Sequence, residues 1–223
     1  MSHKNQKKAV VSQCFVKNIC ISDVETGIIV FQKVYKWKES SAFFNLGGLI
    51  QVFYQFAREV DDGQISCVNF ELGRKVTTRL NQDQLQSRNQ TMQMKSVKTD
   101  DIIVSVFFDM QGMDMPTAEE DLKLDVLMHA VEFVFTQDCL DRLKMKRPTL
   151  QQDMEEQHEA MEELDGRVTL PFEDFSFTAD QLHHQLFPLA IGGMSHDEVL
   201  LDDSLPIEEH VQMQVNIMRS FRA

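Results

Sequence analysis

The stretch LGGLIQVFYQFAREV, residues 46–60, has the spacing of a helix and lies between segments with the composition of strands. Apolar residues recur in it at intervals of three and four, which is the period of one helical face. The residues of this face are Leu46, Leu49, Ile50, Phe53, Ala57 and Val60. Asp61, Asp62 and Gly63 follow, and a turn of this kind ends a helix. We therefore expect one helix over residues 46–60, with its apolar face buried.

Gly47 and Gly48 stand at the head of this helix, although each costs about 1 kcal/mol relative to alanine inside a helix. A phosphate-binding loop would place such glycines after a strand and follow them with lysine and serine or threonine. Leu49 and Ile50 follow here instead. We expect the two glycines to allow close contact between the helix and a sheet, because they carry no side chain.

Two strands are expected before the helix. AVVSQCFVKNICIS, residues 9–22, is rich in β-branched and aromatic residues, and IIVFQKVYKW, residues 28–37, alternates apolar and polar residues. Residues 23–27 separate them and contain the turn-forming pair Thr26 and Gly27. Two strands joined by so short a turn predict a β-hairpin.

Three more strands are expected after the helix, over residues 65–72, 91–97 and 102–110. The polar segment between the first two, residues 73–90, has no clear period and is interpreted as a long loop. The last strand, IIVSVFFDM, is apolar almost throughout. Continuous apolarity is typical of a strand that is covered on both faces, so we expect this strand at the centre of the sheet.

A second helix is expected from Thr117, which can cap its first turn, to about Lys146. Three acidic residues, Glu119, Glu120 and Asp121, suit the positive end of a helix dipole. We expect this helix to end before Pro148. A break near residue 136 is an alternative, because the segment is long enough for two helices.

The elements follow in the order β-β-α-β-β-β-α over residues 9–147, which predicts an α+β fold with a five-stranded, mostly antiparallel sheet. In this order the chain resembles the longin, or profilin-like, domains of vesicle-trafficking SNAREs, adaptor small chains, tethers and exchange-factor subunits. Four stretches carry the resemblance. They are DVETGIIVFQKVYKW, LGGLIQVFYQFAREV, DDGQISCVNFEL and the last strand with its helix. We expect a longin-like domain over residues 1–147.

Residues 148–223 are expected to form an acidic, helical and partly disordered extension. Leu150, Met154, Met161 and Leu164 form a narrow apolar seam that can pack on a partner helix or on the chain's own domain. DEVLLDD, from residue 197, is similar to an acidic dileucine sorting signal. His196 stands where that signal needs an acid, which argues against it.

Charge is divided unevenly along the chain, whose formal net charge is -13. Residues 1–100 hold 14 Lys and Arg against 9 Asp and Glu, whereas residues 101–223 hold 8 against 26. Nucleic-acid affinity depends on neutralising phosphates, so this balance argues against a nucleic-acid partner. No apolar run reaches the ~18 residues of a membrane span, and we expect a cytoplasmic protein, with peripheral attachment to endomembranes left open.

The sequence contains no strong motif for catalysis or metal binding. Cys14, Cys20, Cys67 and Cys139 lack the spacing of a zinc or redox motif, and we expect reduced thiols without a catalytic role. His158 lacks a second histidine at zinc-protease spacing. His183 and His184 are interpreted as a surface pair, and His129 as a core residue. We therefore predict no catalytic residues, no metal and no cofactor.

The resemblance implies a non-enzymatic subunit or adaptor of a vesicle-trafficking or small-GTPase-associated complex. Its expected partners are a small GTPase, another longin-type subunit, or a coat or tether component. Two alternatives stay open, namely a cytoskeletal or ciliary assembly subunit similar to dynein light chains, and an enzyme with an unrecognised site. The residues expected to contact a partner are Tyr35, Trp37, Gln51, Gln55, Arg58, Glu59, Met154 and Met161.

Overall fold

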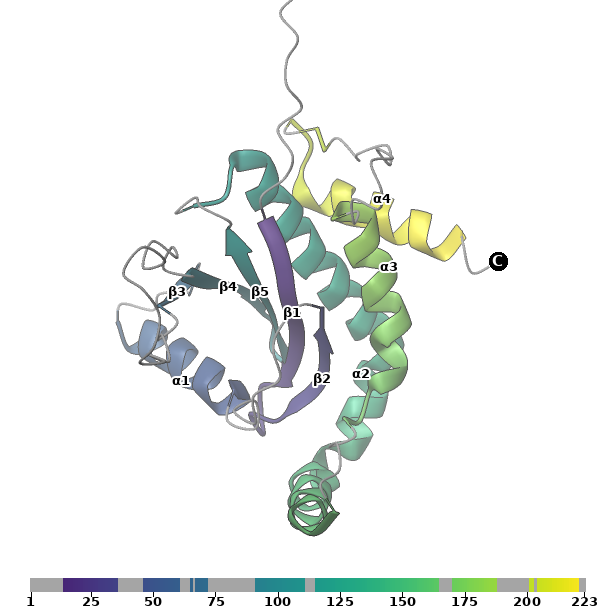
Figure 1. Cartoon of the computed structure of the whole chain (residues 1–223). Helices are drawn as coiled ribbons and strands as arrows, with labels where there is room; N and C mark the ends of the chain where they lie inside the picture. Colours follow the sequence, from purple (N-terminus) through teal and green to yellow (C-terminus); the bar gives the residue numbers. More distant parts are fainter. Residues whose placement is uncertain are drawn as a thin grey trace, which may run out of the picture.

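A five-stranded antiparallel sheet lies between two layers of helices (Figure 1). This computed structural model describes residues 14–35, 46–60, 65, 67–71, 91–110, 115–164, 170–187, 201–202 and 204–220. The strands are β1 (Cys14–Asp23), β2 (Ile29–Val34), β3 (Val68–Glu71), β4 (Thr91–Lys98) and β5 (Ile102–Met110). The helices are α1 (Leu46–Glu59), α2 (Ala118–Leu164), the short 3-10 helix η3 (Glu173–Phe175), α3 (Ser176–Leu186) and α4 (Ile207–Ser220).

The strands follow the spatial order β2-β1-β5-β4-β3, and each neighbouring pair is antiparallel. The predicted α+β class and five-stranded sheet are therefore confirmed. Strand β5 is central, as its continuous apolarity predicted. Its even-numbered residues face α2, whereas Ile103 and Phe107 face α1.

The face covered by α2, α3 and α4 holds the larger apolar cluster. Four phenylalanines from β2, α2 and the segment that contains η3 meet there edge to face. Phe31 of β2 contacts Phe175 of η3 at 5.2 Å between ring centroids, and Phe135 of α2 contacts Phe172 and Phe175 at 5.2 Å. Such edge-to-face pairs stabilise a core beyond the area that they bury.

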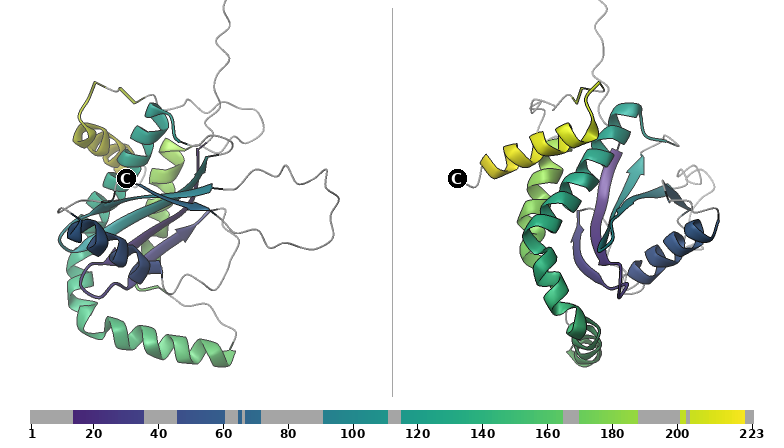
Figure 2. Two further views of the ribbon diagram at one scale, coloured as in Figure 1. Left: turned by 90° about the vertical axis from the view of Figure 1, so that its left-hand side faces the viewer. Right: turned by 180° about the vertical axis from the view of Figure 1, so that it is seen from behind.

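The opposite face is covered by α1 and holds a smaller cluster. Ile50 and Tyr54 of α1 are buried against Cys20, Met94 and Phe107 of the sheet. Figure 2 shows α1 alone on this side of the sheet among the helices drawn in colour.

The two glycines of α1 differ in role. A Cβ atom on Gly47 would lie 2.2 Å from the carbonyl oxygen of Gly27, in the turn between β1 and β2, so only glycine fits there. A Cβ atom on Gly48 would meet nothing within 4 Å. The prediction of a close contact is confirmed for Gly47 and wrong for Gly48, which is exposed.

Helix α2 does not end before Pro148 and has no break at Thr136, which corrects both expectations. A proline inside a helix removes one backbone hydrogen bond and usually bends the helix. Anchors on both sides of Pro148 hold this segment: Arg147 pairs with Asp23 at 2.7 Å, and Leu150 is buried in the larger cluster. Figure 2 shows the last part of α2 turning away from the sheet.

The expected division at residue 147 falls inside α2. Residues beyond it belong to the larger apolar cluster, including Phe172, Leu182 and Val215. The backbone of Phe172 also donates a hydrogen bond to Val30 of β2, at 3.2 Å. The described segments 170–187, 201–202 and 204–220 therefore pack on the sheet domain, because their apolar residues complete the core that α2 begins.

A candidate interaction surface on helix α1

Helix α1 exposes an apolar stripe on the side that faces away from the sheet. The exposed fractions are 42% for Leu49, 59% for Val52, 66% for Phe56 and 56% for Val60. These four residues, which we call the α1 ridge, follow spacings of three and four and so share one face of the helix. Contiguous exposed apolar residues mark interaction sites more often than isolated ones do.

The ridge is a consequence of how the helix packs. Ile50 and Tyr54 face the sheet, so residues half a turn away on α1 face outward. Val52 and Phe56 occupy these outward positions, where a helix that covers one face of a domain normally carries polar residues. Helix α1 is therefore apolar on two sides, of which only one is buried by the described residues.

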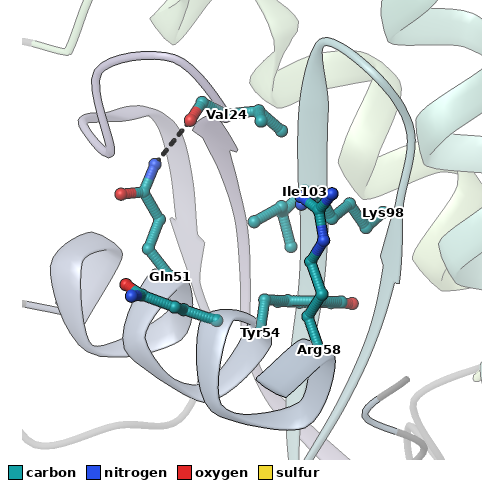
Figure 3. A pocket seen from close by; sticks show the side chains of 7 residues that line it. Val24, Gln51, Tyr54, Arg58, Lys98 and Ile103 are labelled. Carbon is teal, nitrogen blue, oxygen red and sulfur yellow. Dashed lines mark hydrogen bonds between the residues drawn. The ribbon is translucent and has the colours of Figure 1, made fainter. Parts of the chain in front are cut away.

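A shallow depression lies along the edge of α1 opposite the ridge, where α1 meets the end of β4 (Figure 3). Its volume is about 180 Å³. The lining residues are Val24, Gln51, Tyr54, Gln55, Arg58, Lys98 and Ile103. The ammonium group of Lys98 lies 5.5 Å from the centre of the Tyr54 ring. Tyr54 donates a hydrogen bond to Ser96 at 2.9 Å, and burial raises the pKa of its hydroxyl.

Gln51 belongs to this depression, and its role is structural. Its side-chain amide donates hydrogen bonds to the carbonyl oxygens of Val24 at 2.7 Å and Asp23 at 3.3 Å. The amide group therefore ties α1 to the turn between β1 and β2, as Figure 3 shows for Val24. The expectation that Gln51 contacts a partner stays a prediction, although its donor is already used within the chain.

Three other residues expected at the surface of α1 lie there. Gln55, Arg58 and Glu59 are exposed, and Gln55 donates a hydrogen bond to Glu59 at 3.1 Å. Arg58 lines the depression together with Lys98. The structure therefore brings Arg58 next to a second cation from a strand 40 positions later in the chain, which its sequence context did not indicate.

Tyr35 is part of the core packing. Its ring stacks on His183 of α3 with 4.0 Å between centroids, and its hydroxyl donates a hydrogen bond to the carbonyl oxygen of Ala179 at 3.3 Å. Burial raises the pKa of Tyr35 far above its usual range. Trp37, the other expected contact on this hairpin, lies outside the described residues. Tyr35 therefore attaches α3 to the sheet.

The histidine pair is divided between core and surface. His183 is buried against Tyr35, whereas His184 is exposed. Consecutive residues of a helix point about 100° apart, so the interpretation as a surface pair is wrong for His183. Met154 and Met161 lie on α2, and their side chains fall outside the description.

Three of the four cysteines are buried in the protein interior, where they contribute to packing. Cys14, Cys20 and Cys139 are buried and Cys67 is exposed, and all four are free thiols. Burial raises the pKa of Cys20 to about 12, which makes its thiolate inaccessible at neutral pH. Within the described ranges, no three His, Cys, Asp or Glu side chains are grouped so that they could hold a metal ion.

None of the described helices combines the length and apolar content that a membrane crossing needs. No protein-family model matches this chain, and no curated protein matches it either. Any inference about function therefore depends on the α1 ridge, above all on Val52 and Phe56. Sequence reasoning missed both residues, although their signal was present as apolar side chains outside the main helical stripe.

Proposed function

We propose that this chain is a non-enzymatic binding subunit, in which the α1 ridge receives an apolar segment of a partner protein. The observation that carries the proposal is the exposure of Val52, Phe56 and Val60 on one face of a helix whose other face is buried. Water contact of this apolar area is unfavourable, and burial recovers about 25 cal/mol for each Å² removed from water.

The dimensions of the ridge suit a short helical or extended partner segment. Leu49 and Val60 are eleven positions apart, which corresponds to about 16 Å along the axis of a helix. An aromatic residue near the centre of such a surface, here Phe56, commonly contributes most of the binding energy. The ridge thus has a central anchor and aliphatic neighbours on both sides.

The resemblance to longin-type domains supports a more specific proposal. In that role the chain acts in the cytoplasm, as a subunit or adaptor in vesicle trafficking, and its partner is a small GTPase, another longin-type subunit, or a coat or tether component. The order of strands and helices supports this proposal, whereas the exposed ridge supports only the broader one of a protein-binding subunit.

Substitution of the central anchor tests the proposal. Phe56→Ser removes the largest apolar side chain of the ridge without touching the core, so its stability is expected to stay within about 0.5 kcal/mol of the parent protein. Met145→Ser is the matched control, because Met145 is 75% exposed on α2. The purified full chain and both variants are used to capture partners from lysate, and each captured protein is then titrated in pure form by calorimetry.

We expect Phe56→Ser to weaken binding of the purified partner at least tenfold, and Met145→Ser to leave it unchanged. Recovery of small GTPases or coat subunits supports the trafficking proposal, whereas recovery of motor or axonemal proteins supports the cytoskeletal alternative. Equal binding by the parent and the Phe56→Ser variant contradicts the assignment of the ridge as the binding surface.

A further inference from the structure

We propose that the depression beside α1 binds a carboxylate side chain of the partner segment, so that the preferred partner is both apolar and acidic. This inference rests on the proposed function, because it names the chemistry of the partner that reaches the α1 ridge. The two cations of the depression carry it. Arg58 comes from α1 and Lys98 from the end of β4, and both line the same small volume.

The described lining of the depression contains both cations and no carboxylate. Among the residues that the structure describes, no carboxylate forms an ion pair with Arg58 or Lys98, whereas other basic residues of the same sheet and its helices are paired. Lys95 contacts Asp121 and Asp125, and Lys33 contacts Asp180.

The surroundings of these cations strengthen the attraction of an anion. Val24, Ile103 and the ring of Tyr54 form apolar walls, and an ion pair at a partly apolar site is stronger than one in open water. The guanidinium group of an arginine can bind both oxygens of a carboxylate, while a lysine adds a point charge. A volume of about 180 Å³ has room for one such group and its methylene carbons.

The shape of the surface favours a protein segment over a membrane. Arg58 follows Phe56 by two positions, so the two side chains leave α1 about 200° apart around the helix axis. A flat lipid surface resting on Phe56 would therefore have Arg58 on the far side of the helix. A peptide that crosses the outer face of α1 can place an apolar side chain on the ridge and a carboxylate in the depression on the other edge.

Binding of a fluorescein-labelled hexaglutamate peptide, measured by fluorescence anisotropy at low salt, tests this inference. Arg58→Gln and Lys98→Gln each remove one cation from the depression. Lys146→Gln is the matched control, because Lys146 is exposed on α2 and its removal changes the net charge equally. Vesicles with and without 30% phosphatidylserine, assayed by sedimentation with the same proteins, provide the membrane arm.

We expect the parent protein to bind the peptide saturably and each glutamine variant to bind about tenfold more weakly, with Lys146→Gln unchanged. Raising the salt concentration is expected to weaken binding to the parent and to abolish the difference between the proteins. Equal weakening by Lys146→Gln, or no peptide binding by the parent, would overturn the carboxylate site. Phosphatidylserine binding that Arg58→Gln abolishes would overturn it in favour of a lipid phosphate.

The ridge and the depression are tested separately. Phe56→Ser should retain hexaglutamate binding, since the peptide has no apolar side chain for the ridge. Loss of partner capture in Phe56→Ser with unchanged capture in Arg58→Gln would leave the proposed function standing and contradict the further inference. If the depression binds the peptide but Phe56→Ser captures partners as well as the parent does, the proposed function is contradicted and the further inference is not.

Discussion

The two faces of the sheet are covered in different ways. On one face α2, α3 and α4 bury a large cluster that includes Phe31, Phe135, Phe172 and Phe175. On the other face α1 buries a smaller cluster through Ile50 and Tyr54, and it carries exposed apolar residues on its outer side. The first layer supplies most of the buried area and hence the stability of the fold, whereas the second combines modest packing with a surface available to a partner.

The largest expected effect lies in the thicker layer. Phe135→Ala removes a fully buried ring that contacts two other phenylalanines, and we expect a loss of about 3–5 kcal/mol in the free energy of unfolding. Ile50→Ala, its counterpart beneath α1, should cost about 2 kcal/mol, the low end of the range for such truncations. Urea denaturation of both variants measures the difference. Equal losses would contradict the unequal roles of the two layers.

The next effect concerns the joint between α2 and the sheet. Arg147 pairs with Asp23, which is fully buried, and with Asp101 at 3.1 Å. Among the described residues, Arg147→Met leaves the buried Asp23 carboxylate with hydrogen bonds from Thr26 only, and we expect a loss of about 3 kcal/mol. Thermal unfolding followed by circular dichroism checks this value. A change below about 0.5 kcal/mol, typical of exposed pairs, would show that the pair is solvated.

The head of α1 provides a paired test of the thinner layer. Gly47→Ala would place a methyl group against the carbonyl oxygen of Gly27, so we expect a loss of about 1–3 kcal/mol. Gly48→Ala points into open space and should stabilise the helix by about 0.5–1 kcal/mol. Opposite signs in urea denaturation are the expected outcome, and a gain in both variants would contradict the close contact at Gly47.

The smallest effect is a dependence on pH. Burial disfavours the charge of Asp101, but hydrogen bonds from Lys144 and Arg147 outweigh it and lower the pKa of Asp101 below its ordinary 3.8. Because the folded pKa is the lower one, this stabilisation is present above about pH 4 and is lost as the pH falls through the folded value. The free energy of unfolding should fall less steeply below pH 4 in Asp101→Asn than in the parent protein, and the difference should be less than about 1 kcal/mol. The same pH dependence in the variant and the parent would contradict a contribution of Asp101 to stability.

Much of the fold was predictable because local patterns carry it. The continuous apolarity of residues 102–110 predicted the central strand, and the spacing in residues 46–60 predicted α1. Pro148 misled the prediction, because its local preference for ending a helix is outweighed by Arg147 and Leu150, which are held by the sheet. The packing of Phe172 and Leu182 was missed as well, since acidic neighbours made their segment similar to disordered sequences.

The candidate surface was predictable only in part. Arg58 was expected at the surface, but Lys98 joins it through the approach of β4 to α1, and no sequence pattern relates the two. Leu49 and Val60 were expected on the buried face of the helix, yet they are exposed. A broad apolar stripe does not reveal which of its edges meets the sheet, because that depends on the rotation of the helix about its own axis.

The sequence by itself determined the α+β class, the five-stranded sheet and the central place of β5, because these follow from periodicity and apolarity within short segments. Only the tertiary structure decided which side of α1 is buried, which residues continue α2 through Pro148, and which cations meet beside Tyr54. These features depend on contacts between residues far apart in the chain, and the energies of such contacts outweigh local preferences of about 1 kcal/mol per residue.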